Sequence, residues 1–592
     1  MKKITLILLP IILGVALVAL LAIGYSKKAE KVQEIVYTNF HYASFKDKSF
    51  YGDVEEIVPK KVFDEKVYGG ILSHHLYVAS EIAQFFASLK KQHPKTIVLI
   101  GPNHYSLGTD DILVSKYPYQ TPWGILEPDS KTIDQLLQDS IVHNNEQPFE
   151  IEHSIAADVS YIKKAFPDSK LVPIILKRTT SKAKLDQLVS DLNKTLPVDT
   201  LILASVDFSH HSKEIVSEFH DKKSISAIDN FDYDTVLNLE IDSPPSIYTL
   251  LKYLEGKGAQ KMEYKNTNSA IFGANFDSED VTSYLFSYFI KGKPVMSENV
   301  SILNFGDMMF DRGVRVYTQK GKDPFEFIRG TEGNFLKGVD FIIGNLEGPI
   351  IEIPRAECQN KELTFQFAST TNKLLYAANF DLVNLANNHS FDCYQAGIDS
   401  TQKYLSNYNI GYFGNRSLES SYVIKKVHDK NIAFVGIDQT NQPVPVENFY
   451  PLVKRLKSEN NYVVINIHWG YEYDKLQSKI QKEIAHSLID NGADVIFGHH
   501  PHVIQSVEIY KNRTIFYSLG SLIFDQQTSE TNQGIGAGVV LGDNKMNFYI
   551  FPYKITNTQP KFLPFKDMVN FCDEYLKNIV TKNKCLFEVV GN

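Results

Sequence analysis

Short, continuous apolar runs recur along this chain, and they constrain its fold more than any other feature. Examples are TIVLIG (96–101), LVPIIL (171–176), TLILAS (200–205) and YVVINI (462–467). Unbroken apolar runs of this length, bounded by polar residues, are typical of strands buried on both faces of a sheet. Segments with apolar residues at helical spacing lie between them, such as 77–91, where Val78, Ile82, Phe85, Phe86 and Leu89 share one face. The pattern therefore predicts an α/β fold.

The chain has 592 residues, too many for one core, so several domains are expected. The composition is globular, with 43% hydrophobic and 22% charged residues. We predict a membrane anchor or signal segment at 1–25, a spacer at 26–60, a first α/β domain at 61–292, a linker at 293–300, a second α/β domain at 301–560 and a C-terminal tail at 561–592. The linker prediction rests on the polar stretch KGKPVMSEN, which contains Gly and Pro.

An uncharged apolar run at 4–23 is long enough for one membrane-spanning helix. No small-x-small cleavage site follows it, so an uncleaved anchor is favoured over a cleaved signal peptide. We expect a single-pass protein of the cell membrane with the bulk of the chain outside the cytoplasm. The net charge is -8 and no long basic run occurs, which argues against nucleic acid as a partner.

The four cysteines lie in the second half of the chain, and none forms a C-x-x-C pair. This spacing disfavours a structural zinc site. In an exported protein, Cys358–Cys393 and Cys572–Cys585 are reasonable disulfides. Four free buried thiols are the alternative.

Polar residues that can bind metal follow the predicted strands of the second domain. Ligand sites in open α/β sheets lie outside the carboxyl ends of strands, so these residues are expected to converge. Imidazole nitrogens combined with carboxylate and amide oxygens suit Mn, Zn or Fe. A single histidine after a strand is usually a turn residue, but a set spread over separate strand ends predicts a site for one or two divalent ions. Its members are Asp307, Asn345, Glu347, Asn388, His389, His468, His500 and His502.

The same motifs, in the order GDMMFDR, NLEGPI, LANNHSFD, IHWGYEY and GADVIFGHHPHVIQ, resemble the capsule-biosynthesis protein A family of poly-γ-glutamate synthesis, a relative of the calcineurin-like metallophosphoesterases. The resemblance covers 301–526 and implies a four-layer α/β/β/α sandwich. By position it implies that His389 is a proton donor and that Arg312 holds an anionic group. His499 is interpreted as a second-shell or surface residue. The implied metal ligands are Asp307, Glu347, Asn388, His468, His500 and His502.

Two departures from that family affect the chemistry. The opening motif is only GD, and NLE stands where the phosphoesterases have GD-x-x-D. These differences predict fewer ligands, and they leave open a site with one metal or one that acts on an amide or peptide-like bond. In YSLGS, Ser521 replaces the usual Asn. Metal-assisted hydrolysis or transfer is the mechanism that the residue types favour.

A second group of histidines and a carboxylate follows predicted strands of the first domain: His74, His104, Asp207 and His210, with the motif EHS at 152–154 nearby. Two histidines and a carboxylate can form a facial triad for iron, and polar residues lining a cleft are the alternative. GPNH, EHS and DFSH resemble the Memo family, also called AmmeMemoRadiSam system protein B, whose fold is similar to that of extradiol dioxygenases. No cysteine stands near 241–246, where that family has one, so metal binding in this domain is expected to be weaker or to favour a different metal.

Two functions remain open. The first is a membrane-anchored protein of capsule or poly-γ-glutamate synthesis with metal-dependent hydrolase or transferase chemistry. The second is a non-catalytic envelope scaffold or polymer-binding protein whose Memo-like domain has lost its chemistry. Expected partners are the membrane, an anionic or peptide-like polymer, and capsule-export or synthesis proteins.

Overall fold

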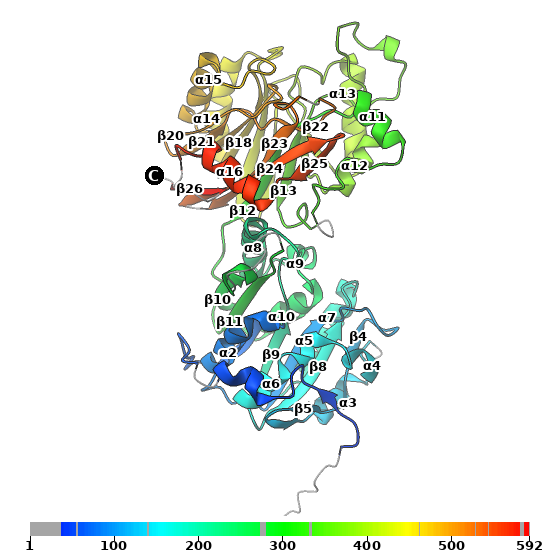
Figure 1. Ribbon diagram of the computed structural model, residues 1–592, viewed down its shortest axis with the longest axis vertical. Coiled ribbons are helices and arrows are strands. Elements are labelled where there is room, and N and C mark those ends of the chain that lie inside the picture. Colours follow the sequence, from blue (N-terminus) through cyan, green and yellow to red (C-terminus); the bar gives the residue numbers. More distant parts are fainter. Residues whose placement is uncertain are drawn as a thin grey trace, which may run out of the picture. The chain divides into compact units, whose positions relative to one another are not determined.

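The computed structural model describes residues 37–54, 57–138, 141–272, 280–330, 334–460, 462–526, 528–542, 544–579 and 585–590. Strands alternate with helices in both predicted domains (Figure 1), which fits the expected mixed α/β fold.

The predicted transmembrane helix at 4–23 lies outside the described residues. Among the described helices, none is long and apolar enough to cross a membrane. The longest of them, α8 (Glu214–Asp229), has 16 residues and is about 24 Å long, short of the ~30 Å hydrocarbon core. The prediction of a membrane-spanning helix and a single-pass membrane protein is therefore corrected: the structure does not support it.

The N-terminal domain is built on an eight-stranded mixed sheet with the order β10-β11-β2-β9-β3-β8-β4-β7. The strands are β2 (Val67–Leu72), β3 (Thr96–Pro102), β4 (Ile112–Val114), β7 (His143–Asn144), β8 (Lys170–Leu176), β9 (Thr200–Ser205), β10 (Lys261–Asn268) and β11 (Ser283–Ile290). A separate three-stranded sheet consists of β1 (His41–Tyr42), β5 (Tyr119–Thr121) and β6 (Gly124–Leu126). The apolar runs predicted as strands are β3, β8 and β9.

Helices cover both faces of this sheet, so its central strands are buried on both sides. One core contains side chains of α3 (Ser130–Leu136), α7 (Lys182–Thr195), α8, α9 (Tyr233–Leu237) and α10 (Pro244–Gly256). The other contains side chains of α2 (Ala79–Ser88) and α6 (Val159–Ala165), including the apolar face predicted for 77–91. The short helices α4 (Glu146–Phe149) and α5 (His153–Ala156) complete the domain.

The C-terminal domain contains two sheets. The nine-stranded sheet has the order β15-β14-β13-β12-β23-β24-β25, with β22 paired to β12 and β26 to β24; the six-stranded sheet has the order β16-β17-β18-β19-β21-β20. The strands of the first are β12 (Val300–Met308), β13 (Phe341–Leu346), β14 (Leu382–Asn384), β15 (Gly411–Phe413), β22 (Ser521–Ile523), β23 (Gln533–Gly542), β24 (Lys545–Thr556), β25 (Gln559–Phe562) and β26 (Leu586–Val590). Those of the second are β16 (Tyr422–Val427), β17 (Lys430–Asp438), β18 (Tyr462–His468), β19 (Val495–His499), β20 (Val507–Tyr510) and β21 (Arg513–Phe516).

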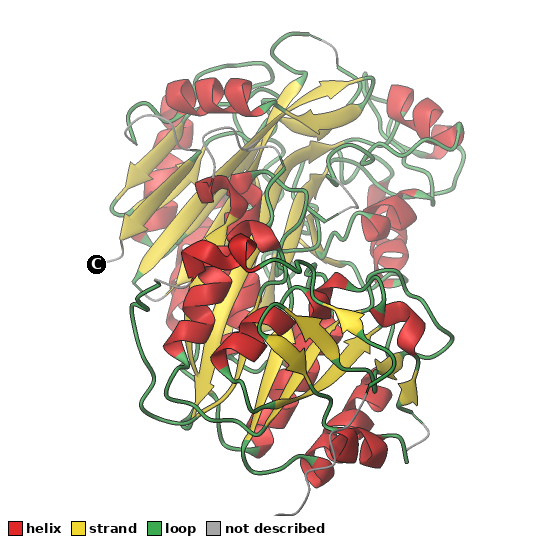
Figure 2. Cartoon of the chain, turned by 60° about the horizontal axis from the view of Figure 1, so that its bottom comes forward, coloured by secondary structure: helices red, strands yellow, loops and turns green. Residues whose placement is uncertain are grey.

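The two sheets pack face to face, with helices on their outer faces (Figures 1 and 2). The core between them joins side chains of β12 and β13 to those of β17, β18 and β19. The outer face of the first sheet packs with α11 (Arg312–Gln319), α12 (Thr371–Ala377) and α13 (Tyr394–Ser406). The outer face of the second packs with α14 (Phe449–Glu459) and α15 (Lys479–Asp490). These are four layers in the order α/β/β/α.

In the segment 474–492, Leu476, Ile480, Ile484 and Leu488 form an apolar stripe at helical spacing, and only half of this stripe is buried. Ile484 and Leu488 of α15 are buried, but Leu476 and Ile480 are 77% and 60% exposed. The helix starts later than the stripe because Ser478 caps its N-terminus in a capping box with Gln481, so Leu476 precedes the helix.

Both predicted disulfides are present, Cys358–Cys393 and Cys572–Cys585. The second fastens α16 (Phe565–Tyr575) to the chain just before β26, and β26 pairs with β24. Residues assigned to the C-terminal tail thus add a strand and a helix to this domain. Similarly, Tyr51, assigned to the spacer, is buried in the N-terminal domain.

Candidate metal centre

The carboxyl ends of strands from both sheets of the C-terminal domain meet around one buried carboxylate, Glu347. Asp307 ends β12, Glu347 follows β13, His468 ends β18, and His500 and His502 follow β19. Ligand atoms of Glu347, His468 and His500 lie within 4.8 Å of one another, and so do those of Asp307, Glu347 and His502. All five residues are buried. The predicted convergence of strand ends is therefore observed, and Glu347 belongs to both groups.

Glycines before two of these strand ends let the chain come close to the last loop. A Cβ on Gly306 would lie 1.8 Å from the carbonyl oxygen of Gly520, and one on Gly498 would lie 2.0 Å from that of Tyr517. No side chain fits at such distances, so glycine is required directly before Asp307 and His499. This explains the GD and GH pairs of the sequence.

Glu347 is an unusual buried carboxylate because neither of its oxygens has a hydrogen-bond partner. Burial raises the pKa of Glu347 well above its ordinary value, and the nearby Asp307 adds to this effect while His502 opposes it. Its Oε1 lies 3.8 Å from His468 Nε2 and 3.7 Å from His502 Nε2, beyond hydrogen-bond distance. A buried charge without partners is costly, so this site requires a proton or a cation.

Asp307 and His502 form the charged part of the cluster, with 3.0 Å between Asp307 Oδ2 and His502 Nδ1. Burial alone would raise the pKa of Asp307, but the contact with His502 outweighs it, and the pKa is lowered. Burial would also lower the pKa of His502, but Glu347 and Asp307 raise it to about 9. Burial, together with His502, lowers the pKa of His500 to about 4, so this imidazole is neutral and able to bind a metal.

His500 and His502 lie in a turn rather than in an extended segment. β19 ends at His499, and the φ angles of His500 and His502 are +96° and +56°. Such angles are rare outside glycine and concentrate at functional sites, where surrounding structure enforces them. The two imidazoles therefore reach Glu347 from a tight turn and fall in different ligand groups.

Asparagines align the acidic and imidazole side chains. Asn345 Nδ2 donates a 2.7 Å hydrogen bond to Asp307 Oδ1 and lies 3.2 Å from His468 Nδ1. His468 Nε2 lies 2.9 Å from the Oδ1 of Asn388, a predicted ligand. Asn345 Oδ1 in turn accepts from Asn384 and Asn387. The strand-end position of Asn345 was a visible signal, although its role as the hub of this network was not.

His389, the predicted proton donor, is held by a carboxylate that sequence reasoning missed. Its Nδ1 lies 2.8 Å from Asp392 Oδ2, and Asp392 is fully buried. The Phe365 ring packs against the imidazole at 4.0 Å between centroids. Burial lowers the pKa of His389, while Asp392 opposes the shift. The spacing of three residues between His389 and Asp392 is a signal that could have indicated this pair.

Three further residues singled out in the sequence also lie in the C-terminal domain. Arg312, the expected anion-binding residue, has a φ of +49° and forms a salt bridge with Asp525. His499 is fully buried rather than at the surface, with Nδ1 3.7 Å from Asp307 Oδ1. Ser521 is buried in register with Asp307, and its hydroxyl has no hydrogen-bond partner.

A second cluster occurs in the N-terminal domain, where β2, β3 and β9 end. Ligand atoms of His74, His104 and His153 lie within 4.8 Å of one another, and so do those of His74, Asp207 and Asp242. His74 Nε2 lies 3.3 Å from Asp242 Oδ2. Three of the predicted residues, His74, His104 and Asp207, are thus brought together.

The structure corrects the membership of this N-terminal cluster. His210 belongs to neither ligand group, whereas His153 and Asp242 do. His153 lies within the EHS motif, so its signal was present in the sequence. Asp242 lies in the stretch where a cysteine was sought, and it enters the cluster through tertiary packing before α10, which no local pattern indicates.

Ion pairs already neutralise several of the charged groups in this second cluster. Glu152 Oε1 lies 2.7 Å from His104 Nδ1, and its other oxygen accepts the His104 backbone N–H. Burial opposes both shifts, yet the pKa of His104 is raised to about 10 by Asp242 and Glu152, and that of Glu152 is lowered to about 2 by His104. Burial lowers the pKa of His153 to about 4.

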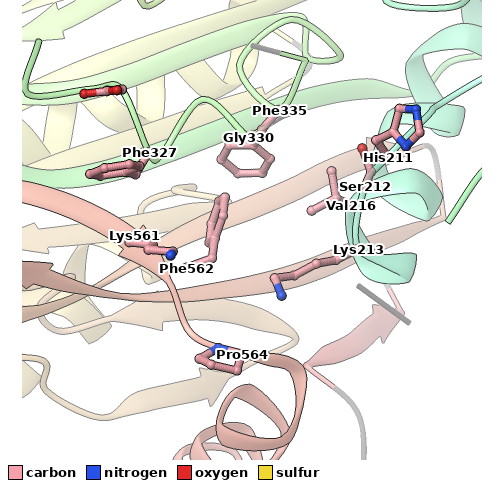
Figure 3. Close-up of a pocket in the computed structure, with 11 residues that line it drawn as sticks. His211, Ser212, Lys213, Val216, Phe327, Gly330, Phe335, Lys561, Phe562 and Pro564 are labelled. Carbon is pink, nitrogen blue, oxygen red and sulfur yellow. The ribbon is translucent and has the colours of Figure 1, made fainter. Parts of the chain in front are cut away.

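A cavity of about 460 Å³ is lined by residues from both domains and is separate from these clusters (Figure 3). Phe327, Phe335 and Phe562 form its aromatic walls, and Lys213 and Lys561 lie at its edge. None of the predicted site residues lines it.

The four-layer sandwich and its buried carboxylate–imidazole cluster define an α/β protein with a candidate divalent-metal centre. Comparison with known proteins agrees with this class. Residues 301–526 match the family described as bacterial capsule synthesis protein PGA_cap, and residues 50–271 match that described as Memo-like protein.

Related proteins match the two parts separately. The PGA biosynthesis protein CapA of Bacillus subtilis (strain 168) is 30% identical over 46% of this chain and 76% of its own length. The capsule biosynthesis protein CapA of Bacillus anthracis is 31% identical over 45% of this chain and 70% of its own length. A MEMO1 family protein of Caldivirga maquilingensis is 32% identical over 28% of this chain and 57% of its own length. The chain belongs to the bacterial capsule synthesis protein family and also contains a Memo-like domain.

Proposed function

We propose that this capsule synthesis protein is a metal-dependent hydrolase or transferase that acts on an anionic or peptide-like polymer through its C-terminal domain. The observation that carries the proposal is Glu347, a fully buried carboxylate with two unpartnered oxygens surrounded by imidazoles from other strands. A divalent cation would satisfy both oxygens, so the residues present fit a metal.

The two overlapping ligand groups suit one ion or two, because Glu347 is common to both. Buried carboxylate and imidazole ligands favour Mn, Zn or Fe. Asn388 supplies an amide oxygen next to His468. When bound, such a metal would stabilise negative charge on a substrate oxygen and lower the pKa of a nearby water. Its proposed ligands are Asp307, Glu347, Asn388, His468, His500 and His502.

The chain's own residues would handle the proton and the substrate's charge. Asp392 holds His389 by Nδ1, which fixes the ring so that Nε2 is the nitrogen able to give a proton to a leaving group. The lowered pKa keeps the His389 imidazole mainly neutral, so Nε2 would first take a proton from the attacking water and then pass it to the leaving group. Arg312 retains N–H donors beyond its salt bridge with Asp525 and would bind an oxyanion of the substrate.

Metal analysis of the purified full chain tests this proposal. The wild type is expected to hold about one or two equivalents of a divalent metal, and the His500→Ala/His502→Ala variant less than a tenth of that. His486→Ala is the matched control, because His486 is a partly exposed histidine of α15 that pairs with Glu508. Equal, near-zero metal in the wild type and the double variant, under conditions that load a known metalloenzyme, would contradict the proposal.

A non-catalytic scaffold that binds capsule-export or synthesis proteins is the alternative. It predicts no metal-dependent cleavage of phosphoester or γ-glutamyl substrates. Activity that disappears in His389→Ala while metal content is unchanged would exclude it.

The N-terminal cluster is a second candidate metal site, since His74 and Asp242 lie at its centre beside His104 and Asp207. We propose that it binds metal more weakly, because His104 and Glu152 already neutralise each other. No reaction is assigned to it.

A further inference from the structure

A cavity of about 590 Å³ is lined in part by Phe365, whose ring packs against the proposed catalytic histidine, and it has its own set of cationic residues. It is lined by Arg312 and by the loop from Arg355 to Phe365, which includes Lys361. Phe365 links it to the candidate metal centre, because its ring contacts both the His389 imidazole and, at 5.3 Å, the Arg312 guanidinium. A substrate reacting beside His389 would therefore extend into this cavity.

The loop that forms the cavity wall is fixed to the segment that carries His389. The Cys358–Cys393 disulfide joins the two segments, and Gln359 donates a hydrogen bond from its backbone N–H to the Asp392 carbonyl. The Asp392 carboxylate also accepts the Phe365 backbone N–H at 2.6 Å. A wall held by covalent and buried polar contacts is preorganised for binding, which reduces the entropy lost when a ligand is ordered.

Each of the three cationic side chains that line the cavity forms a salt bridge with an acidic side chain. Arg312 pairs with Asp525, Arg355 with Asp311, and Lys361 with Asp392. The cations are 34%, 51% and 34% exposed, whereas Asp311 and Asp392 are 3% and 0% exposed. Guanidinium and ammonium groups keep further N–H donors when one carboxylate is bound. In addition, Arg312 Nε is buried without a hydrogen-bond partner.

We propose that this cavity is the substrate-recognition subsite of the protein and that it binds a pendant carboxylate of a peptide-like polymer. The proposal rests on the proposed function, whose metal centre would act on the neighbouring bond. Positioned guanidinium groups match the planar geometry of a carboxylate. Because each lining cation already has an acidic partner, the cavity offers many donors with little surplus positive charge, which suits a singly charged carboxylate better than a doubly charged phosphate. The subsite also resolves how a chain of net charge -8 could bind a polyanion: recognition is local.

Binding calorimetry on the full chain at low ionic strength tests the subsite, with a γ-linked glutamate oligomer as the probe. The wild type is expected to bind it, and Arg355→Gln to bind it at least tenfold more weakly. Arg355 contacts Asp311 and the Thr364 carbonyl but not His389, so its loss does not act through the proposed proton donor. Lys361→Met is a second variant, with the same expected direction.

Arg455→Gln is the matched control, because Arg455 is an exposed arginine of α14 that pairs with Glu459. It should bind as the wild type does. The γ-linked oligomer whose free α-carboxylates are replaced by uncharged amides should not bind, and inorganic phosphate should not displace the glutamate oligomer at equal concentration. Thermal unfolding of each variant checks that the loop variants remain folded.

Metal content measured on the same samples separates this inference from the proposed function. Loss of binding in folded Arg355→Gln supports the subsite, whether or not metal is present. Equal affinity in the wild type, Arg355→Gln and Lys361→Met, or no binding to the wild type, would overturn the subsite even if the metal centre is loaded. Displacement by phosphate would overturn the assignment to carboxylates. Absence of metal with Arg355-dependent binding would contradict the proposed function alone.

Discussion

The two polar clusters of this protein are built from the same residue types at the carboxyl ends of strands, yet they differ in how their charges are satisfied. In the C-terminal cluster, Asp307 pairs with His502, burial keeps the imidazole of His500 neutral, and Glu347 has no hydrogen-bond partner. In the N-terminal cluster, Glu152 pairs with His104, whose pKa is raised to about 10. Each cluster thus contains one carboxylate–imidazole ion pair, and the C-terminal cluster contains in addition a buried carboxylate, Glu347, that needs a proton or a cation. We therefore expect the two clusters to differ in metal affinity despite their similar residue types, with Glu347 as the cause.

The largest effect that separates the clusters should come from Glu347→Gln. This change removes the carboxylate common to both ligand groups, so we expect metal affinity to fall at least a hundredfold. Without metal, the variant should unfold at a higher temperature than the wild type, because the raised pKa of Glu347 means that its ionised form destabilises the fold at neutral pH. With saturating metal, the order should reverse, because only the wild type gains binding energy.

Thermal unfolding with and without Mn²⁺ measures both effects. His486→Gln, on the surface of α15, is the control. A Glu347→Gln variant that is less stable than the wild type without metal would show that this carboxylate has a partner in solution.

A smaller effect is expected from the ion pair of the N-terminal cluster, and it depends on pH. The pKa of Glu152 is lowered to about 2, so its contribution to stability is present above its unfolded value of 4.5 and is lost as pH falls toward 2. The pKa of His104 is raised to about 10, so its contribution is present below its unfolded value of 6.5 and is lost as pH rises toward 10. The pair should thus stabilise the metal-free protein most between pH 4.5 and 6.5.

Glu152→Gln measures this contribution. Its free energy of unfolding should be about 2 kcal/mol below that of the wild type within the window, with a smaller difference at pH 9. Denaturant unfolding at a series of pH values provides the comparison. A difference that does not change with pH would mean that Glu152 acts through its backbone hydrogen bonds rather than through the ion pair.

The smallest effect should come from His153→Gln. The His153 side chain is 47% exposed, and its pKa is lowered to about 4, so it contributes neither a buried charge nor deep packing. We expect the free energy of unfolding to change by less than about 0.5 kcal/mol. The same measurement on His468→Gln, a fully buried position, gives the contrast. A larger loss in His153→Gln would indicate that this histidine is part of a tightly coupled site.

The sequence predicted the position of a site residue best where that position is set by the end of a strand. Asp307, Glu347 and His468 each sit at or just past the end of a buried strand, and parallel strands end at the same edge, so their convergence followed from the pattern. The apolar runs located the strands β3, β8 and β9, and the cysteine positions suggested the two disulfides. It failed where tertiary packing or loop conformation decides: Asp242 joins the N-terminal cluster from the start of α10, and His500 and His502 reach Glu347 only through positive φ angles.

The sequence also did not predict which buried charged groups have hydrogen-bond or ion-pair partners. Nothing in the motifs separates Glu347 without partners from Glu152 with several, because the distinction depends on distances of a few ångströms between loops. The pairing of His389 with Asp392 is intermediate: the residues are three positions apart, but only the folded loop shows the contact.

The central claim is that the unpaired Glu347 cluster holds the metal. Anomalous scattering from crystals of the full chain grown with Mn²⁺ tests it most directly. We predict a strong anomalous peak within bonding distance of Glu347 and the His500 and His502 imidazoles, and a weaker peak or none beside His74. No peak at Glu347, or a peak beside His74 alone, would contradict this account.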